Sequence, residues 1–367
     1  MKPVWRKAAS LSRTLGFALL AAGCSAALSS AVERNGSAEA RYLDGSNGRD
    51  WPGPGRTYGE RHYSPLAAIN DQTVSRLGLA WSLDLPPGYS VTQPIAVDGV
   101  LYFAAGLGTV SAVDAASGKL LWQFDPKVWQ GEQAKMSTAW GSRGISWWDG
   151  LVFLGTLDGR LIAIDAETGR QSWSVQTTEK GDGRFITGAP RVFDGKVIVG
   201  HGGADSAPVR GYVTAYDARS GKQLWRFYTV PGDPAEGFED EAMKMAARTW
   251  HGQWWKHGGG GNVWNAMSYD PETGTVFLGT GNGSPWNYKV RSKGRGDNLF
   301  LSSIVALDAG SGAYKWHYQT NPGESWDYNA AMDMEFADLE IEGRPRKVLL
   351  TAPKNASSMS STAPTAS

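Results

Sequence analysis

The chain alternates between short apolar runs and small polar turns, which is the pattern of a protein built from strands. Residues 99–105, 151–155 and 195–200 are such runs, rich in Val, Leu, Ile and aromatic residues and bounded by Gly and Asp. Short runs of β-forming residues between turn formers are typical of buried strands. The pattern therefore predicts an all-β fold.

A spaced motif, Ala-x-Asp-x-x-(Ser/Thr)-Gly-x-x-x-Trp, recurs along the chain. Its four full copies span residues 112–122, 163–173, 215–225 and 306–316. A weaker copy at residues 268–274 keeps the Asp and the Gly but has no tryptophan. The first three tryptophans are 51 and 52 residues apart, a period typical of repeat folds whose units bury their apolar faces on one another.

The motif also indicates how each repeat is built. An Asp in a turn bonds nearby backbone N–H groups, and Gly supplies the positive φ of a tight hairpin. Tryptophan combines a large apolar area with one N–H donor, which suits packing between neighbouring sheets. Several short strands in each period, arranged radially, predict a β-propeller.

Composition adds two constraints. The 367 residues include 47 Gly and 17 Trp, in keeping with short strands and tight turns. Lys plus Arg and Asp plus Glu number 36 each, so the charge pattern gives no sign of a nucleic-acid partner. Cys24 is the only cysteine, so we expect no disulfide within the mature chain.

Residues 1–31 have the pattern of an export signal. Basic residues up to Arg13 precede an apolar run at 15–22, and small residues follow. This run is shorter than the roughly 20 apolar residues of a membrane span. The residues before Cys24 resemble a bacterial lipobox, so cleavage before Cys24 with lipid attachment is an alternative to ordinary signal cleavage. Both alternatives predict a periplasmic protein.

Residues 356–367 differ from the rest of the chain. They are rich in Ser, Ala and Thr, have low complexity, and follow an apolar run that is predicted to be a strand. The segment is either a natural unstructured tail or the product of a frameshift. We favour the frameshift, because one permissible codon choice read in a shifted frame encodes a strand-like sequence rich in aromatic residues. The nucleotide sequence distinguishes the two.

Four stretches are more specific than a propeller requires. They are residues 258–264 (Gly-Gly-Gly-Gly-Asn-Val-Trp), 281–287 (Gly-Asn-Gly-Ser-Pro-Trp-Asn), 326–328 (Trp-Asp-Tyr) and 352–355 (Ala-Pro-Lys-Asn). With the repeated tryptophan motif, they resemble the alcohol dehydrogenases of methanol and ethanol type that depend on pyrroloquinoline quinone (PQQ). The resemblance implies an eight-bladed quinoprotein β-propeller with tryptophan-docking motifs. Residues 40–355 would form about five of its blades, so we expect an incomplete propeller.

The resemblance also implies roles for individual residues around a central channel, where PQQ lies over a Ca²⁺ ion. Asp327 would be the general base that takes the proton of the substrate hydroxyl. Calcium prefers oxygen donors, and its ligands would be Asp205, Asn282 and Asp327. The other contacts to PQQ would come from Arg143, Thr187, Gly203, Ala204, Trp264 and Lys354. Trp264 would form the floor beneath the quinone, Arg143 would pair with a PQQ carboxylate, and Lys354 would donate to the quinone oxygens.

The chain departs from the family pattern at several positions. Asp205 stands where the family has a glutamate, so the loop or the ion must shift; a carboxylate in a surface turn is the alternative interpretation. Ser137 and Thr138 replace an adjacent cysteine pair whose disulfide covers one face of PQQ, and Val91 replaces a glutamate that contacts PQQ. Asn329 stands where lanthanide-using relatives have an additional Asp, which favours calcium here.

These features together predict oxidation of a small alcohol to an aldehyde. The sequence has no Cys-x-x-Cys-His motif, so we expect no attached haem c, and a separate cytochrome c or quinone would accept the electrons. An incomplete propeller exposes sheet edges, so we expect the chain itself to be weakly active or inactive. The alternative is a non-enzymatic propeller lipoprotein that acts as an outer-membrane assembly scaffold, with Cys24 as its lipid anchor.

Overall fold

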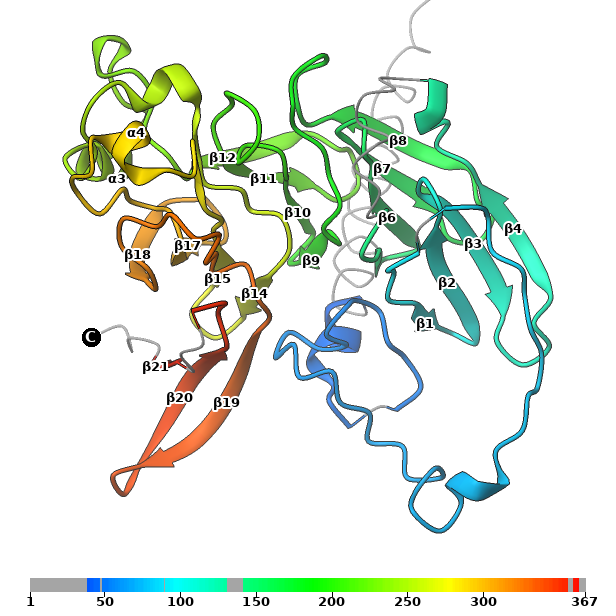
Figure 1. Cartoon of the computed structure of the whole chain (residues 1–367). Helices are drawn as coiled ribbons and strands as arrows, with labels where there is room; N and C mark the ends of the chain where they lie inside the picture. Colours follow the sequence, from blue (N-terminus) through cyan, green and yellow to red (C-terminus); the bar gives the residue numbers. More distant parts are fainter. Residues whose placement is uncertain (1–37, 47, 89, 131–140, 356–358, 363–367) are drawn as a thin grey trace, which may run out of the picture.

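The computed structural model describes residues 38–46, 48–88, 90–130, 141–355 and 359–362. Antiparallel sheets dominate them and lie side by side in an arc, as a β-propeller requires (Figure 1). The three apolar runs form strands, as predicted. The predicted signal peptide, Cys24, Ser137 and Thr138 lie outside the described residues. Within the described part of the chain, helices are too short or too polar to span a membrane.

Four blades have four antiparallel strands each. They are, in chain order, β1 (Ile95–Val97), β2 (Val100–Ala105), β3 (Thr109–Asp114) and β4 (Leu120–Phe124); β5 (Ser146–Trp148), β6 (Leu151–Gly155), β7 (Arg160–Asp165) and β8 (Gln171–Gln176); β9 (Arg191–Phe193), β10 (Lys196–Gly200), β11 (Tyr212–Asp217) and β12 (Gln223–Tyr228); and β14 (Met267–Asp270), β15 (Thr275–Gly279), β17 (Ser303–Asp308) and β18 (Tyr314–Gln319).

The fifth sheet has three strands, β19 (Met334–Ile341), β20 (Arg344–Thr351) and β21 (Met359–Thr362). A small two-stranded sheet pairs β13 (Gly259–Gly260) with β16 (Gly283–Ser284). Besides the helical residues 38–43, the short helices are η1 (Val74–Arg76), η2 (Val128–Gln130), η3 (Pro234–Glu236), α3 (Glu241–Ala247), η4 (Trp254–His257) and α4 (Tyr288–Ser292).

The weaker motif copy does not form a blade of its own. Asp270 is the last residue of β14, Gly274 lies in the turn before β15, and the full copy at 306–316 lies in β17 and β18 of the same sheet. The long segment between β15 and β17 separates the two copies. The five sheets therefore arise from four full motif copies and one sheet without the motif.

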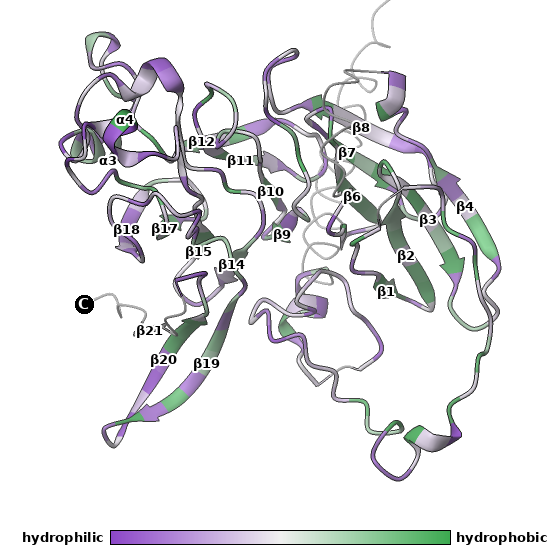
Figure 2. Cartoon of the chain, in the orientation of Figure 1, coloured by the Kyte–Doolittle hydropathy of each residue, from purple (hydrophilic) through white to green (hydrophobic). Residues whose placement is uncertain are grey.

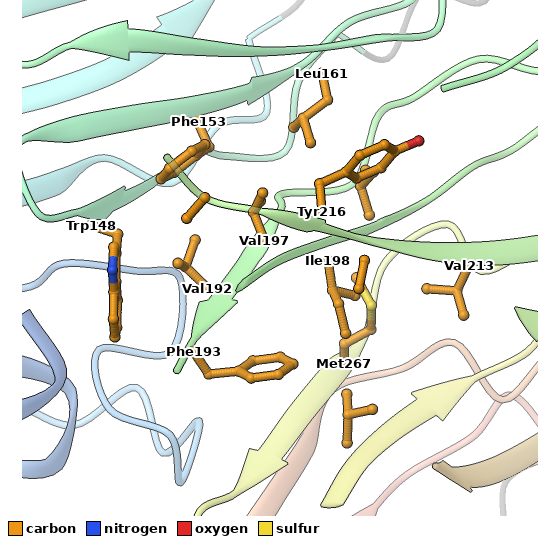
Figure 3. Packing of buried hydrophobic residues seen from close by; sticks show 14 of the residues in the cluster. Trp148, Phe153, Leu161, Val192, Phe193, Val197, Ile198, Val213, Tyr216 and Met267 are labelled. Carbon is orange, nitrogen blue, oxygen red and sulfur yellow. The ribbon is translucent and has the colours of Figure 1, made fainter. Parts of the chain in front are cut away.

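The middle strands of the blades are buried because neighbouring blades cover both of their faces. Phe153 in β6 and Ile198 in β10 are fully buried, whereas the outermost strand β8 alternates between exposed and partly buried positions. Figure 2 shows the same contrast between hydrophobic inner strands and a largely hydrophilic β8. In Figure 3, Phe153, Ile198 and Met267 come from three successive blades and belong to one apolar cluster.

The repeated motif forms a contact between consecutive blades among the first four. The indole Nε1 of Trp122 donates to the carbonyl oxygen of Ala166 in the following blade at 3.0 Å. Its ring lies against Gly169, which has a φ of 70° and leaves no room for a Cβ atom. The same indole hydrogen bond joins Trp81 to Ala115, Trp173 to Ala218 and Trp225 to Ala309. These contacts confirm the role predicted for the tryptophans.

The turn aspartates also behave as the motif predicts. Asp165 Oδ1 accepts hydrogen bonds from the hydroxyl and the backbone N–H of Thr168, both at 2.7 Å. These bonds favour the carboxylate and lower the pKa of Asp165.

The segment before the first blade braces the arc of sheets. Trp51 pairs with a residue of β1, and the hydroxyl of Tyr42 donates to a carbonyl of β5 at 2.7 Å. Glu60 binds Arg191 of β9 through two hydrogen bonds at 3.0 and 3.3 Å. Arg61 Nε donates to a carbonyl of β19 at 2.8 Å. One segment therefore contacts the first, second, third and fifth sheets.

Candidate functional site

Strand topology brings the predicted site residues together. The first two strands of a sheet are antiparallel, so the segment before the first strand and the loop after the second lie at the same end. In the fourth blade, for example, Trp264 precedes β14, Asn282 follows β15, and these two strands pair along their length. Arg143, Thr187, Trp264 and Asp327 precede first strands of four successive sheets, whereas Asp205, Asn282 and Lys354 follow second strands.

Backbone hydrogen bonds connect these segments around the centre of the arc. The N–H of Gln93 donates to the carbonyl of Arg143 at 3.0 Å, and the N–H of Arg143 donates to the carbonyl of Thr187 at 2.8 Å. The N–H of Ala330 donates to the carbonyl of Thr280 at 2.9 Å. The segments that carry the candidate side chains are therefore held by neighbouring blades.

An open cavity of about 340 Å³ lies where the segments meet. Eight of the nine predicted residues line it, and they are Arg143, Thr187, Gly203, Asp205, Trp264, Asn282, Asp327 and Lys354. Ala204 does not: it is fully buried, and its N–H donates to Asn262 Oδ1 at 2.7 Å. The structure thus gathers the predicted set, except that Ala204 supports the wall from behind.

Asp327 lines the cavity and has polar partners. Its Oδ2 accepts from Lys354 Nζ at 2.7 Å, and its Oδ1 accepts from Asn329 Nδ2 at 3.0 Å. The backbone of Asp327 has a φ of 62°, in the left-handed region that few residues other than Gly adopt. Lys354 therefore pairs with the predicted base. The side chain of Asp327 is 33% exposed to solvent, and that of Lys354 is 41% exposed.

The amide of Asn282 is suited to binding a cation with Asp327. The amide group lies 3.1 Å from Asp327 Oδ1, so its oxygen and that carboxylate oxygen could share a cation if the amide turned its oxygen toward Asp327. In the reverse orientation the amide nitrogen donates to Asp327 Oδ1 at 3.1 Å, and the oxygen accepts from Trp286 Nε1 at 2.9 Å. The amide can therefore form hydrogen bonds within the protein when no cation is bound, and it can turn its oxygen toward a cation when one binds.

Asp205 lies on the same cavity, and its carbonyl accepts from Trp286 Nε1 at 3.1 Å. Across the described residues, no three His, Cys, Asp or Glu side chains gather as a metal site. A cation here would therefore need the neutral oxygen of Asn282 in addition to the carboxylates of Asp205 and Asp327. Such a mixture of carboxylate and amide oxygens is the donor set that Ca²⁺ accepts.

Arg143 and Trp264 form another wall of the cavity. The guanidinium of Arg143 lies 4.7 Å from the centre of the Trp264 ring, and its Nη1 donates to Thr187 Oγ1 at 2.5 Å. Burial lowers the pKa of Arg143. The site therefore offers a flat aromatic surface next to a cation, which suits a planar anionic ligand.

Val91 lies beside this cavity and not in it. It lines a neighbouring cavity of about 200 Å³ that shares Arg143 with the first. Two further polar residues of the site were not singled out from the sequence. Asn262 bonds the loop of Ala204, and Glu324 bonds the backbone next to Asp327. Asn262 lies within the glycine-rich motif, which gave a signal, whereas nothing in the sequence around Glu324 sets it apart.

His201 supports the loop that carries Asp205. It is buried, its Nε2 accepts from the N–H of Tyr212 at 3.2 Å, and its Nδ1 donates to the carbonyl of Gly202 at 3.0 Å. These bonds require the neutral ring. Burial lowers the pKa of His201 to about 3.

The lowered pKa of His201 predicts loss of stability in mild acid. The unfolded histidine protonates near pH 6.5, so below about that pH the unfolded state binds a proton that the native state refuses until about pH 3. The free energy of unfolding should therefore fall as the pH drops through this window. In His201→Gln, whose amide oxygen can still accept from Tyr212, urea unfolding should show a shallower decline. Equal declines in both proteins would contradict the prediction.

Comparison with known proteins identifies the family. Residues 51–358 match the family model described as "PQQ: Glucose/ethanol/alcohol dehydrogenase, beta-propeller domain". The chain is 48% identical over 358 residues to the quinohemoprotein alcohol dehydrogenase of Comamonas testosteroni, covering 96% of this chain and 50% of that protein. It is 53% identical over 311 residues to quinohemoprotein alcohol dehydrogenase ADH IIB of Pseudomonas putida, covering 84% of this chain and 45% of that protein.

Solved structures agree. The quinohemoprotein alcohol dehydrogenase ADHIIG of Pseudomonas putida HK5 superposes with a TM-score of 0.82 at 50% identity, over 86% of this chain and 46% of that one. A europium-containing methanol dehydrogenase gives a TM-score of 0.77 at 31% identity, over 88% of this chain and 57% of that one. The chain thus spans about half the length of the curated relatives it matches. It belongs to the PQQ-type β-propeller family of the glucose, ethanol and alcohol dehydrogenases.

Proposed function

We propose that this chain is the PQQ- and Ca²⁺-binding part of a quinoprotein that oxidises a small alcohol to an aldehyde. The observation that carries the proposal is the meeting of eight predicted residues at one cavity, where the Asn282 amide lies next to the Asp327 carboxylate. The names of the relatives, which are alcohol dehydrogenases, support the reaction class. They do not favour the alternative of a non-enzymatic assembly scaffold.

In this proposal the side chains of the cavity divide the work. Asp205, Asn282 and Asp327 hold the cation through oxygen atoms. The Trp264 ring supports the planar cofactor from one side, and the positive charge of Arg143 binds an anionic group of it.

Asp327 also accepts the proton of the substrate hydroxyl, for which it lies on the open cavity. Lys354, hydrogen-bonded to Asp327, can exchange that bond for one to a developing negative charge. When bound, PQQ supplies the redox chemistry by accepting the two electrons of the alcohol.

The electron acceptor and the location of the protein are also part of the proposal. A separate cytochrome c or quinone would accept the electrons, and the predicted signal sequence would direct the protein to the periplasm. Two relatives have names that refer to quinone or to cytochrome c: a dehydrogenase subunit of Gluconobacter oxydans and the lupanine 17-hydroxylase of a Pseudomonas species.

Cofactor binding tests the proposal without relying on turnover. The purified chain is titrated with PQQ in the presence of CaCl₂ or of a chelator, and tryptophan fluorescence is followed. We expect saturable quenching that depends on Ca²⁺ and corresponds to one PQQ per chain. An absence of saturable, Ca²⁺-dependent PQQ binding would refute the proposal.

Replacing Trp264 by alanine is expected to weaken PQQ binding about tenfold to a hundredfold, because a stacked aromatic face contributes about 1–3 kcal/mol. Trp264→Phe should retain most of the affinity, since it keeps an aromatic face. Trp129, which is about half exposed and does not line the cavity, provides the matched control Trp129→Ala. Equal PQQ affinities for the two alanine variants would contradict the role of Trp264.

A further inference from the structure

We propose that Glu324 and Arg291, two buried residues outside the cavity lining, position Asp327 and Asn282 for binding the cation. The inference rests on the proposed function, because it concerns the same cation site. Glu324 and Arg291 are each 1% exposed. Neither lines the cavity, so they would act through the residues that do.

Glu324 holds the turn that presents Asp327. Its Oε1 accepts from the N–H of Trp326 and, at 3.0 Å, from the N–H of Tyr328. These two N–H groups flank Asp327, whose φ of 62° is unfavourable for a residue with a side chain. A carboxylate that binds both N–H groups favours the turn in which this conformation is required.

Arg291 joins this turn to the loop that carries Asn282. Its Nη1 donates to the carbonyls of Pro285 and Trp286 at 2.8 and 3.1 Å, and its Nη2 donates to the carbonyl of Glu324 at 2.5 Å. The first two carbonyls follow Asn282 closely in the chain, and the third precedes Asp327. One guanidinium therefore fixes the spacing of the two loops whose oxygens would share the cation.

Arg291 is tightly packed against the loop that carries Asn282. A Cβ atom added to Gly283, the neighbour of Asn282, would come within 2.4 Å of the guanidinium. Burial lowers the pKa of Arg291 to about 10, and the nearby charge of Glu324 acts in the opposite direction, so the side chain stays charged at neutral pH. Both side chains direct hydrogen bonds to backbone groups of these two loops, which points to a positioning role.

The role of Glu324 predicts an effect on Ca²⁺ affinity at a fixed, saturating PQQ concentration. Loss of a residue that orients metal ligands costs about 10–100-fold in metal affinity, and we expect this loss for Glu324→Ala. Glu324→Gln should stay close to the unchanged protein, because its amide oxygen still accepts both N–H groups. Glu324→Asp keeps a carboxylate but is one methylene shorter, so it should also lose Ca²⁺ affinity. As the smallest change in chemistry, it is the variant least expected to disturb folding.

The control is Glu239→Ala, which removes a glutamate carboxylate away from the cavity lining, one that accepts from Arg210 Nη1 at 2.7 Å. Ca²⁺ affinity is measured by calorimetric titration and the melting temperature of each variant without Ca²⁺ by circular dichroism. If Glu324→Ala and Glu324→Asp bind Ca²⁺ as tightly as Glu239→Ala, the positioning role is wrong. If the unchanged chain shows no PQQ-dependent Ca²⁺ binding, the proposed function fails, and this inference with it.

Discussion

For the weak alcohol-dependent dye reduction expected of this chain, replacing Asp327 by asparagine should lower the rate by about 10²–10⁴-fold, the range that a general base contributes. Asparagine has nearly the same shape, and its amide oxygen can still face the cation, but it cannot accept the proton of the hydroxyl. Lys354 and Asn329, which both donate to the Asp327 carboxylate, would then meet a neutral group. PQQ binding should survive, because Trp264 and Arg143 are unchanged.

Two measurements check this expectation. Dye reduction is compared among preparations with equal bound PQQ, and Ca²⁺ affinity is measured separately, since loss of one negative charge should weaken cation binding by about tenfold or more. Asp338→Asn, at an exposed position of β19, is the control. Turnover by Asp327→Asn within a factor of about two of that control would exclude Asp327 as the base.

The second large effect is expected on stability. Arg191→Met should destabilise the protein by about 3–5 kcal/mol, because it leaves the buried Glu60 carboxylate without its partner. The two side chains are each 10% exposed and share two hydrogen bonds, and Arg191 also donates to the carbonyl of Ala189 at 3.0 Å. Burial raises the pKa of Glu60, and the positive charge of Arg191 opposes that shift. The ionised form of Glu60 therefore depends on the guanidinium of Arg191.

Urea unfolding of the two single variants and the double variant tests this prediction. Adding Glu60→Gln to Arg191→Met should recover part of the lost stability, since a neutral amide is easier to bury than an unpaired carboxylate. If Arg191→Met costs less than about 1 kcal/mol, the pair does not brace the third blade.

Much of the fold could be predicted from local pattern alone. The Asp-to-Gly turn and the docking tryptophan each depend on a few neighbouring residues, and they recur, so a single sequence reveals them. Trp81 escaped prediction because its own motif is absent and only its contact with Ala115 identifies it. The weaker copy misled in the other direction, because Asp270 and Gly274 form an ordinary hairpin turn within an existing blade.

The candidate site was predictable only through resemblance. Arg143, Asp205 and Lys354 are far apart in the chain and share no spacing, so their meeting follows from the order of strands within each sheet and of sheets around the arc. Given that order, a rule emerges: residues before a first strand and after a second strand face the same end. This rule does not predict Glu324 and Arg291, because they bond to backbone groups, which every residue type has.

The indole contacts between blades separate two kinds of evolutionary constraint. Each of the three seams among the first four blades depends on one tryptophan, one glycine and one carbonyl, none of which lines the cavity. Substitutions at the hub can therefore accumulate without loosening any seam, provided the loops keep their length. If Asp205 binds the proposed cation, its shorter side chain is a change that such a frame can accommodate without altering the contacts between blades.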